Sequence, residues 1–124
     1  MKKLNIVVAD DSKFMRTFIR RIVERMGHNV VAEASNGREL IEIMKSMKEV
    51  PDLVFIDINM PEMDGLNALK AIRNTEKDVK IVIVSALGQD EVIKYAKSIG
   101  IVDFITKPFT PDKIVRVVES IGKN

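Results

Sequence analysis

Short apolar runs rich in Val and Ile alternate along the chain with longer segments whose apolar residues recur at helical spacing. Most of the short runs are apolar throughout, which is typical of parallel strands that helices cover on both faces. The pattern predicts strands over the ranges Leu4–Ala9, Asn29–Ala34, Leu53–Ile56, Lys80–Val84 and Val102–Thr106.

The longer segments are amphipathic, and residues that commonly begin or end helices flank them. Ser12 is expected to cap the first helix, and Gly27 is expected to follow its last turn. Further boundaries are indicated by Asn36-Gly37, Gly65, Gly100 and Pro111. The apolar faces expected from these helices comprise Phe14, Met15, Phe18, Ile19, Ile22, Val23, Met26, Leu40, Ile41, Met44, Met47, Leu66, Leu69, Ile72, Val92, Ile93, Ala96, Ile99, Ile114, Val115, Val118 and Ile121.

Regular alternation of strands and helices predicts an α/β fold, a doubly wound, five-stranded parallel sheet with right-handed crossovers and five helices. A chain of 124 residues has the usual length of one domain. It contains no linker, internal repeat or low-complexity stretch, so one domain is expected over residues 1–124.

Composition narrows the class of protein. Hydrophobic residues make up 46% of the chain and charged residues 31%, as in ordinary globular proteins. A net charge of +2 is too small to favour nucleic acid as the main partner. Because the chain has no cysteine, a disulfide, a zinc-thiolate site and a thiol nucleophile are all excluded.

The N-terminal stretch MKKLNIVVADDS has only a short apolar run, which ends in two acids. It is too short and too charged for a signal peptide or a membrane span. We therefore expect a cytoplasmic protein without a membrane partner.

The first helical segment carries several basic side chains. They are Lys13, Arg16, Arg20, Arg21 and Arg25. A solvated helix face is the expected explanation, and docking of an acidic partner is the alternative.

Polar residues gather where the predicted strands end. They are Asp10 and Asp11 after the first strand, Asp57 after the third, Ser85 after the fourth, and Thr106, Lys107 and Pro108 at the fifth. Only Ser35 follows the second strand, as expected of an edge strand. In open α/β sheets, ligands bind beyond the carboxyl ends of the strands, so these side chains are expected to share one rim.

Asp57 taken alone could be a strand-end residue that caps the next turn. Three carboxylates on one rim repel one another, however, and a hard divalent cation such as Mg²⁺ would relieve that repulsion through oxygen ligands. The single histidine, His28, lies away from the rim and is expected to be structural or solvent-facing. With a hydroxyl and a lysine nearby, these groups are the ones needed for phosphoryl transfer to a carboxylate.

The motifs ADDS, VFIDINMPEMDGL, VIVSA and FITKPF occur in this order from near Leu4 onward. Together they resemble the receiver domain of two-component response regulators over nearly the whole chain. The resemblance implies the flavodoxin-like strand order 2-1-3-4-5. It also implies that Asp57 is the phosphoacceptor, and that Mg²⁺, or Mn²⁺ in its place, is held by Asp10, Asp11, Asp57 and the backbone carbonyl of Asn59.

Further roles follow from the same resemblance. Ser85 would turn toward the phosphoryl group, and Lys107 would form an ion pair with it. The Lys107–Pro108 peptide bond is expected to be cis. Phe104 stands at the position of the family's switch aromatic, although ordinary strand packing also explains an aromatic residue there.

The resemblance implies a signalling switch rather than an enzyme, phosphorylated by a histidine kinase. The output partner would bind the face made by the fourth helix, fifth strand and fifth helix. The string INMPEMDGLNALKAIR and the lack of a further domain are most similar to single-domain chemotaxis regulators. The target would then be a flagellar motor switch or an archaeal adaptor, and a monomer is expected.

Other functions stay open from sequence. An aspartyl-phosphate phosphatase would need an acid two residues after Asp57, where the chain has Asn59. A flavodoxin-like electron carrier would need a Ser/Thr-rich loop and flavin-stacking aromatics, whereas the chain has ADDS, one Tyr and no Trp. A phosphorelay intermediate, or a receiver of a pathway other than chemotaxis, would share all the motifs.

Overall fold

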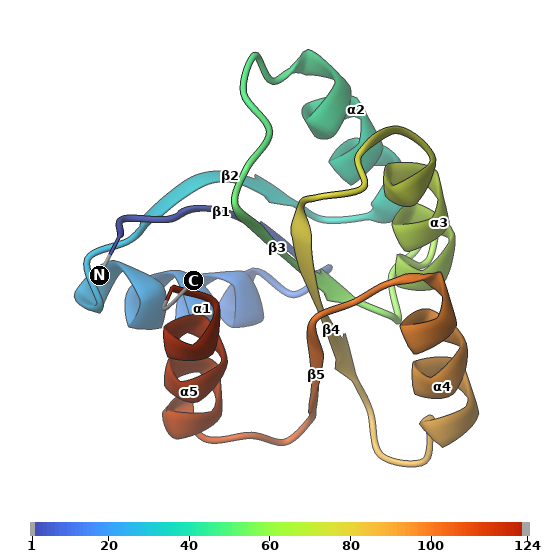
Figure 1. Ribbon diagram of the computed structural model, residues 1–124. Helices are drawn as coiled ribbons and strands as arrows, with labels where there is room; N and C mark the ends of the chain where they lie inside the picture. The colour runs from blue at the N-terminus through green and yellow to red at the C-terminus, as the bar shows by residue number, and fades with distance from the viewer. Residues whose placement is uncertain (1, 123–124) are drawn as a thin grey trace.

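The computed structural model describes residues 2–122 (Figure 1). Strands and helices alternate along this part of the chain. The strands are β1 (Asn5–Ala9), β2 (Asn29–Ala34), β3 (Leu53–Asp57), β4 (Lys80–Ser85) and β5 (Asp103–Thr106). The helices are α1 (Lys13–Arg25), α2 (Gly37–Ser46), α3 (Gly65–Thr75), α4 (Asp90–Ile99) and α5 (Pro111–Gly122).

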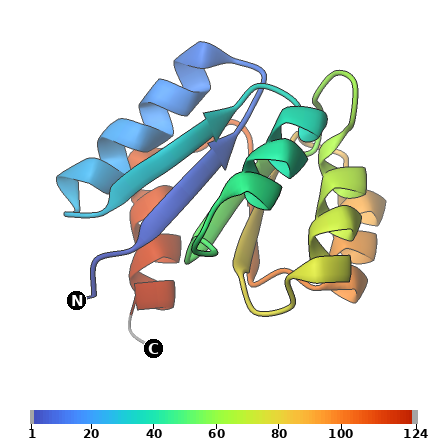
Figure 2. The same ribbon diagram turned by 90° about the horizontal axis from the view of Figure 1, so that it is seen from above.

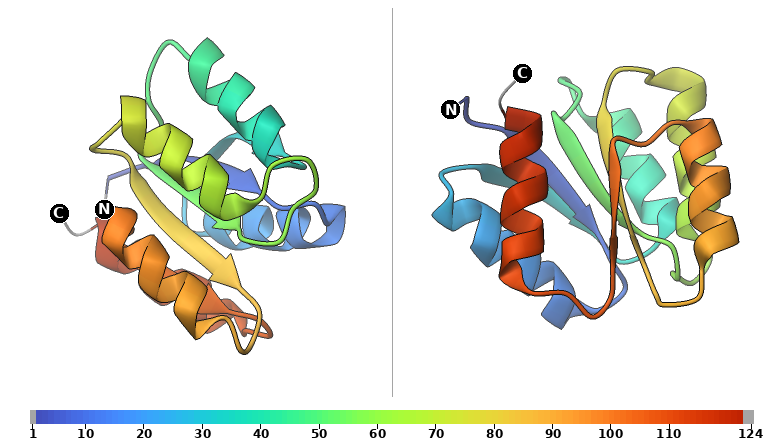
Figure 3. Two further views of the ribbon diagram at one scale, coloured as in Figure 1. Left: turned by 90° about the vertical axis from the view of Figure 1, so that its right-hand side faces the viewer. Right: turned by 60° about the horizontal axis from the view of Figure 1, so that its bottom comes forward.

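The five strands form one parallel sheet in the order β2-β1-β3-β4-β5, which confirms the predicted fold. Helices α1 and α5 cover one face of the sheet, and α2, α3 and α4 cover the other (Figures 1, 2 and 3). The strand order reverses between β1 and β3, so the loops after these two strands lie at the point where such sheets bind ligands.

Each face of the sheet has its own hydrophobic cluster. Successive side chains of a strand point to opposite faces, so alternate residues of each strand enter different clusters. Val54 packs with the cluster beneath α2, α3 and α4, and its neighbour Phe55 packs with the cluster beneath α1 and α5. Every residue of β3 is buried, as expected of a central strand covered on both sides.

Most predicted boundaries agree with the structure, with small shifts at strand ends. The first strand begins at Asn5 and the fifth at Asp103, one residue later than predicted. Asp57 and Ser85 are the last residues of the third and fourth strands, which each extend one residue beyond the predicted range. Both side chains are therefore fixed by strand backbone rather than by a loop.

Local signals at helix ends are confirmed. The Ser12 hydroxyl caps α1 by accepting the Met15 N–H at 3.2 Å. Gly27 follows α1 with a φ of +95°, a backbone conformation that glycine adopts readily. The prediction that Phe14 belongs to the buried face of the first helix is wrong. Its side chain is 76% exposed and stacks on Phe18 at the surface. None of the helices between residues 2 and 122 is long and apolar enough to span a membrane.

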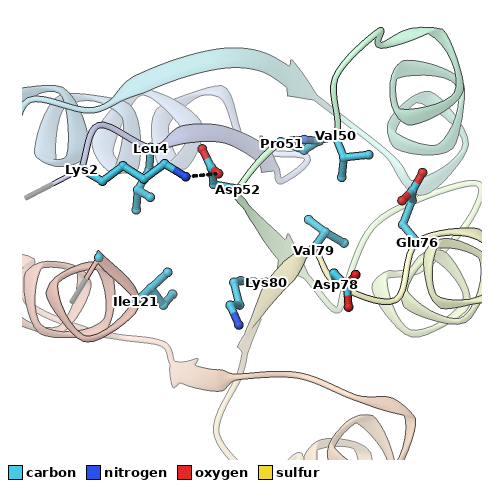
Figure 4. Close-up of a pocket in the computed structure, with 11 residues that line it drawn as sticks. Lys2, Leu4, Val50, Pro51, Asp52, Glu76, Asp78, Val79, Lys80 and Ile121 are labelled. Carbon is cyan, nitrogen blue, oxygen red and sulfur yellow. Dashed lines mark ion pairs between the residues drawn. The ribbon is translucent and has the colours of Figure 1, made fainter. Parts of the chain in front are cut away.

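The amino-terminal end of the sheet holds a pocket of about 390 Å³ (Figure 4). At its edge, Asp52 forms an ion pair with Lys2 at 3.5 Å and accepts the backbone N–H of Asn5 at 2.7 Å. At the same end of β1, His28 is buried and its Nδ1 accepts the Leu4 N–H at 2.9 Å. This confirms a structural role for the histidine.

Candidate functional site

Asp57 closes β3 and is only 3% exposed. The loop behind it turns back closely: the Gly65 N–H donates to the Ile58 carbonyl at 2.9 Å. A Cβ at Gly65 would collide with the Asp57 carbonyl oxygen, so only glycine fits there without a backbone shift. Gly65 of the motif therefore allows the loop to return close to the backbone of Asp57.

Three carboxylates come together at this end of the sheet. Asp10, Asp11 and Asp57 each offer an oxygen atom, and these atoms all lie within 4.8 Å of one another. Asp10 is 1% exposed, whereas Asp11 lies at the surface. The structure thus brings together the three acids that the sequence places after β1 and at the end of β3.

Lys107 bridges the two buried acids of this cluster. Its Nζ lies 3.3 Å from an oxygen of Asp10 and 3.4 Å from an oxygen of Asp57. The lysine reaches the site from the residue directly after β5, across β4. Lys107 therefore forms ion pairs with two of the three carboxylates.

Burial and neighbouring charges both shift the pKa values of the two groups in contact, Asp57 and Lys107. Burial raises the pKa of Asp57, and the neighbouring Asp10 raises it further against the opposing effects of Lys107 and the Asn59 N–H. Burial alone would lower the pKa of Lys107, but Asp57 and Asp10 together raise it. The charged form of Asp57 is therefore disfavoured by burial and by Asp10, and Lys107 offsets this only in part.

Ser85 ends β4 next to this cluster. Its Oγ is fully buried and has no hydrogen-bond partner among the described residues 2–122. The residue before it, Val84, pairs in register with Asp57. A buried hydroxyl without a hydrogen-bond partner is unfavourable, typically by about 1–3 kcal/mol. A ligand that accepts a hydrogen bond from it would remove this cost.

The other predicted site residues lie around the cluster. The Asn59 N–H donates to Asp57 at 3.2 Å, and its side chain is exposed. The Lys107–Pro108 peptide bond is cis. Phe104 is partly buried on β5, with the Lys97 ammonium group 5.0 Å from its ring centroid.

A divalent cation fits the residues present. The three acids supply oxygen donors, the atoms that Mg²⁺ prefers. Burial and the neighbouring Asp10 hold the pKa of Asp57 above its ordinary value although Lys107 is in contact with it, and a bound cation would favour the charged carboxylate. Asp10, Asp11 and Asp57 are the side chains that would hold the ion.

The contacts of Arg16, Arg20 and Gln89 at and beside the site were not predicted from the sequence. Arg16 donates to the Asp10 carbonyl at 2.7 Å and pairs with Glu33, as does Arg20, so these two arginines are not simply part of a solvated basic face. Gln89 donates to the Asn59 side chain at 3.3 Å. The position of Gln89 just before α4 did not indicate this contact, because the hydrogen bond joins two loops that are far apart in the sequence.

Comparison with known proteins identifies the class. Residues 6–119 match the response regulator receiver domain family. The chain belongs to this family, in which phosphorylation and Mg²⁺ binding are general features.

Chemotaxis proteins named CheY are similar to the whole chain. It is 40% identical to CheY of Thermotoga maritima over 118 residues, which cover 95% of this chain and 97% of that protein. It is 45% identical to CheY of Bacillus subtilis over 118 residues, with 95% and 94% covered. The chain is thus a receiver of the CheY-like kind.

Solved structures agree with this fold. The chain matches the crystal structure of a CheX-CheY-BeF3-Mg²⁺ complex from Borrelia burgdorferi with a TM-score of 0.90 and 31% identity. The match covers 96% of this chain and 89% of that one.

Proposed function

We propose that this protein is a phosphorylation-activated switch of a two-component system, with Asp57 as the phosphoacceptor. The observation that carries the proposal is the convergence of three carboxylates, one lysine and an unpartnered buried hydroxyl at the carboxyl end of the sheet. A histidine kinase of the chemotaxis type is the proposed donor.

In the proposed transfer, an oxygen of the Asp57 carboxylate attacks the phosphorus of a phosphohistidine. The P–N bond to the imidazole breaks as the new P–O bond forms, and the histidine leaves with the bonding electrons. Lys107, already 3.4 Å from Asp57, is positioned to pair with the incoming phosphoryl oxygens. The Asn59 N–H supplies a further donor at the same carboxylate.

A Mg²⁺ ion bound by Asp10, Asp11 and Asp57, with the backbone carbonyl of Asn59 as a further ligand, would supply positive charge at the phosphoryl oxygens. Asp10 contributes by its burial, since a carboxylate fixed in the core is pre-oriented as a ligand. The exposed Asp11 gives the site its opening to solvent.

Activation follows from the new acceptor oxygens on Asp57. The Ser85 hydroxyl, which has no partner among residues 2–122 before transfer, turns to a phosphoryl oxygen and donates a hydrogen bond to it. Phe104 then turns inward and leaves its contact with Lys97. Side chains at Asn59 and Leu87, which flank the site, set how readily water reaches the acyl phosphate.

The output partner binds the face made by α4, β5 and α5. This face carries the partly buried aromatic side chain of Phe104 on β5, with the ammonium group of Lys97 from α4 over its ring. A component of a flagellar or archaellar motor, or an adaptor to it, is the proposed target. We propose that this receiver domain acts as a monomer in the cytoplasm, without nucleic acid or membrane as a partner.

The test is phosphoryl uptake from acetyl phosphate, read by intact mass with and without Mg²⁺. The wild type is expected to gain one phosphoryl group only with Mg²⁺, and Asp57→Asn is expected to gain none. Asp52→Asn is the matched control, because it changes an acid at the other end of the same strand. No gain in the wild type would overturn the proposal.

A second measurement separates the switch from its rivals. Steady turnover of small phosphomonoesters would indicate a phosphatase instead. Transfer from the phosphorylated protein to histidine phosphotransfer proteins of the same cell would indicate a relay intermediate.

A further inference from the structure

Gln89 connects the two segments that frame the acidic cluster. Its Oε1 accepts the backbone N–H of Ala86 at 2.6 Å. Its amide also pairs with the amide of Asn59, from Nε2 to Oδ1 at 3.3 Å and from Nδ2 to Oε1 at 3.5 Å. Ala86 directly follows Ser85, and Asn59 stands two residues after Asp57. One side chain thus joins the segment of the hydroxyl to the segment of the phosphoacceptor.

The helix does not need this side chain. Gln89 occupies the N-cap of α4, where a side chain commonly accepts an N–H of the first helical turn. It makes no such bond. Its side chain lines a surface cavity of about 430 Å³ between the β3–α3 loop and α4. The amide is therefore used for the loops rather than for the helix.

The peptide unit between Ser85 and Ala86 is held on both sides. The Ser85 carbonyl accepts the Lys107 backbone N–H at 2.7 Å, and the Ala86 N–H donates to Gln89. Because a peptide unit is planar, one hydrogen bond at each end fixes the orientation of the plane. The unpartnered Ser85 hydroxyl is carried by this fixed segment.

We propose that Gln89 is a latch that holds the Ser85–Ala86 segment in its unphosphorylated arrangement. The inference rests on the proposed function, because it requires a phosphoryl group on Asp57. Such a group brings three acceptor oxygens, and movement of the segment toward them breaks the hydrogen bond between Ala86 and Gln89. The latch therefore favours the unphosphorylated state, and Gln89 is a positioning residue that acts through Ala86.

Beryllofluoride with Mg²⁺ serves as the probe, because it stands in for a phosphoryl group on a carboxylate and needs no turnover. Gln89→Met removes the amide while nearly keeping the length of the side chain. Ser98→Ala is the matched control, since it removes a hydrogen bond to the Tyr95 carbonyl at the other end of α4. Binding is followed by the backbone amide signals of the whole protein in nuclear magnetic resonance spectra.

Gln89→Met is expected to bind beryllofluoride about fivefold more tightly than the wild type, the effect of releasing one hydrogen bond. The control is expected to bind like the wild type. Without ligand, the Ala86 amide of Gln89→Met should exchange with solvent several-fold faster. Gln89→Glu retains an acceptor for Ala86, so slow exchange of that amide is expected to persist.

A purely structural role predicts the opposite sign, because a loosened loop would weaken binding. Equal or weaker binding by Gln89→Met, with the wild type still binding, overturns the latch and leaves the proposed function standing. Failure of the wild type both to bind beryllofluoride and to take up a phosphoryl group overturns both.

Discussion

Strand β3 has an aspartate at each end, and the two acids are in opposite situations. Asp52, just before the strand, accepts the Asn5 N–H at 2.7 Å and faces Lys2 in an ion pair. Asp57, its last residue, shares Lys107 with Asp10. The side chain of Asp52 is 29% exposed and that of Asp57 only 4%. Asp52 therefore links the start of β3 to the start of β1, whereas the carboxylate of Asp57 can bind a cationic ligand.

The difference arises from position in the fold rather than from residue type. At the amino end, the carboxylate of Asp52 has a backbone donor and one cation to itself, and water also reaches it. At the carboxyl end, parallel strands bring their terminal residues to one edge, so acids from β1 and β3 meet. The same residue type thus stabilises the fold at one end of the strand and belongs to the proposed binding site at the other.

The largest effect that separates the two ends is stabilisation by Mg²⁺. At a Mg²⁺ concentration of about 100 times the dissociation constant, the wild type should gain about 2.7 kcal/mol in free energy of unfolding. Asp52→Asn should keep this gain, and Asp57→Asn should lose most of it, because of these two acids only Asp57 belongs to the proposed metal site. Thermal unfolding with Mg²⁺ and with EDTA measures the difference. Equal gains in both variants would break the comparison.

Without metal, the two substitutions should change stability in opposite directions. Asp57→Asn removes a buried charge crowded by Asp10 and should raise the free energy of unfolding by about 1–2 kcal/mol. Asp52→Asn weakens the contacts to Asn5 and Lys2 and should lower it by about 1 kcal/mol. Urea unfolding at pH 7 in EDTA provides the values. Destabilisation by both substitutions would show that Asp57 is adequately paired.

The smallest effect is a pair of opposite pH dependences. Burial raises the pKa of Asp57 above 3.8, so the folded state binds more protons above that pH and stability falls as pH rises toward the folded pKa. Burial lowers the pKa of His28 below 6.5, so the unfolded state binds more protons and stability rises as pH rises to 6.5. Each slope is at most about 1.4 kcal/mol per pH unit.

Variants separate these two slopes. Asp57→Asn should lose the falling contribution, and His28→Asn, which retains an acceptor for the Leu4 N–H, should lose the rising one. Urea unfolding in EDTA from about pH 4 to about pH 7, between the ordinary pKa values of carboxyl and imidazole groups, measures both. If the slope of stability against pH is unchanged in one of these variants, the substituted group does not contribute to the pH dependence.

Local signals predicted the elements well because they act over a few residues. Ser12 and Asn36 cap helices by bonds to the N–H three residues ahead, at 3.2 Å and 2.8 Å. The sequence predicted strand ends less accurately, because hydrogen bonding to the neighbouring strand decides whether a polar residue still belongs to the strand. Asp57 does so opposite Val84, although its side chain is charged.

Helical periodicity could not show which part of an apolar face would be covered. Phe14 shares the spacing of Phe18 and Ile19, yet only Ile19 is fully buried. The reason is that α5 covers part of α1, and Phe14 lies beyond it with its ring against Phe18 at a centroid distance of 6.3 Å. Similarly, the pairing of Arg16 and Arg20 with Glu33 depends on where β2 lies beside α1.

The apolar runs predicted the parallel sheet and, because parallel strands end at one edge, also the rim that carries Asp10, Asp11, Asp57, Ser85 and Lys107. Which of these groups have a hydrogen-bond or ion-pair partner became visible in the three-dimensional structure alone. Lys107 touches two acids, Ser85 has no partner within residues 2–122, and Gln89 reaches across to Asn59. Those contacts depend on how loops distant in sequence approach one another, and short-range spacing carries no information about that distance.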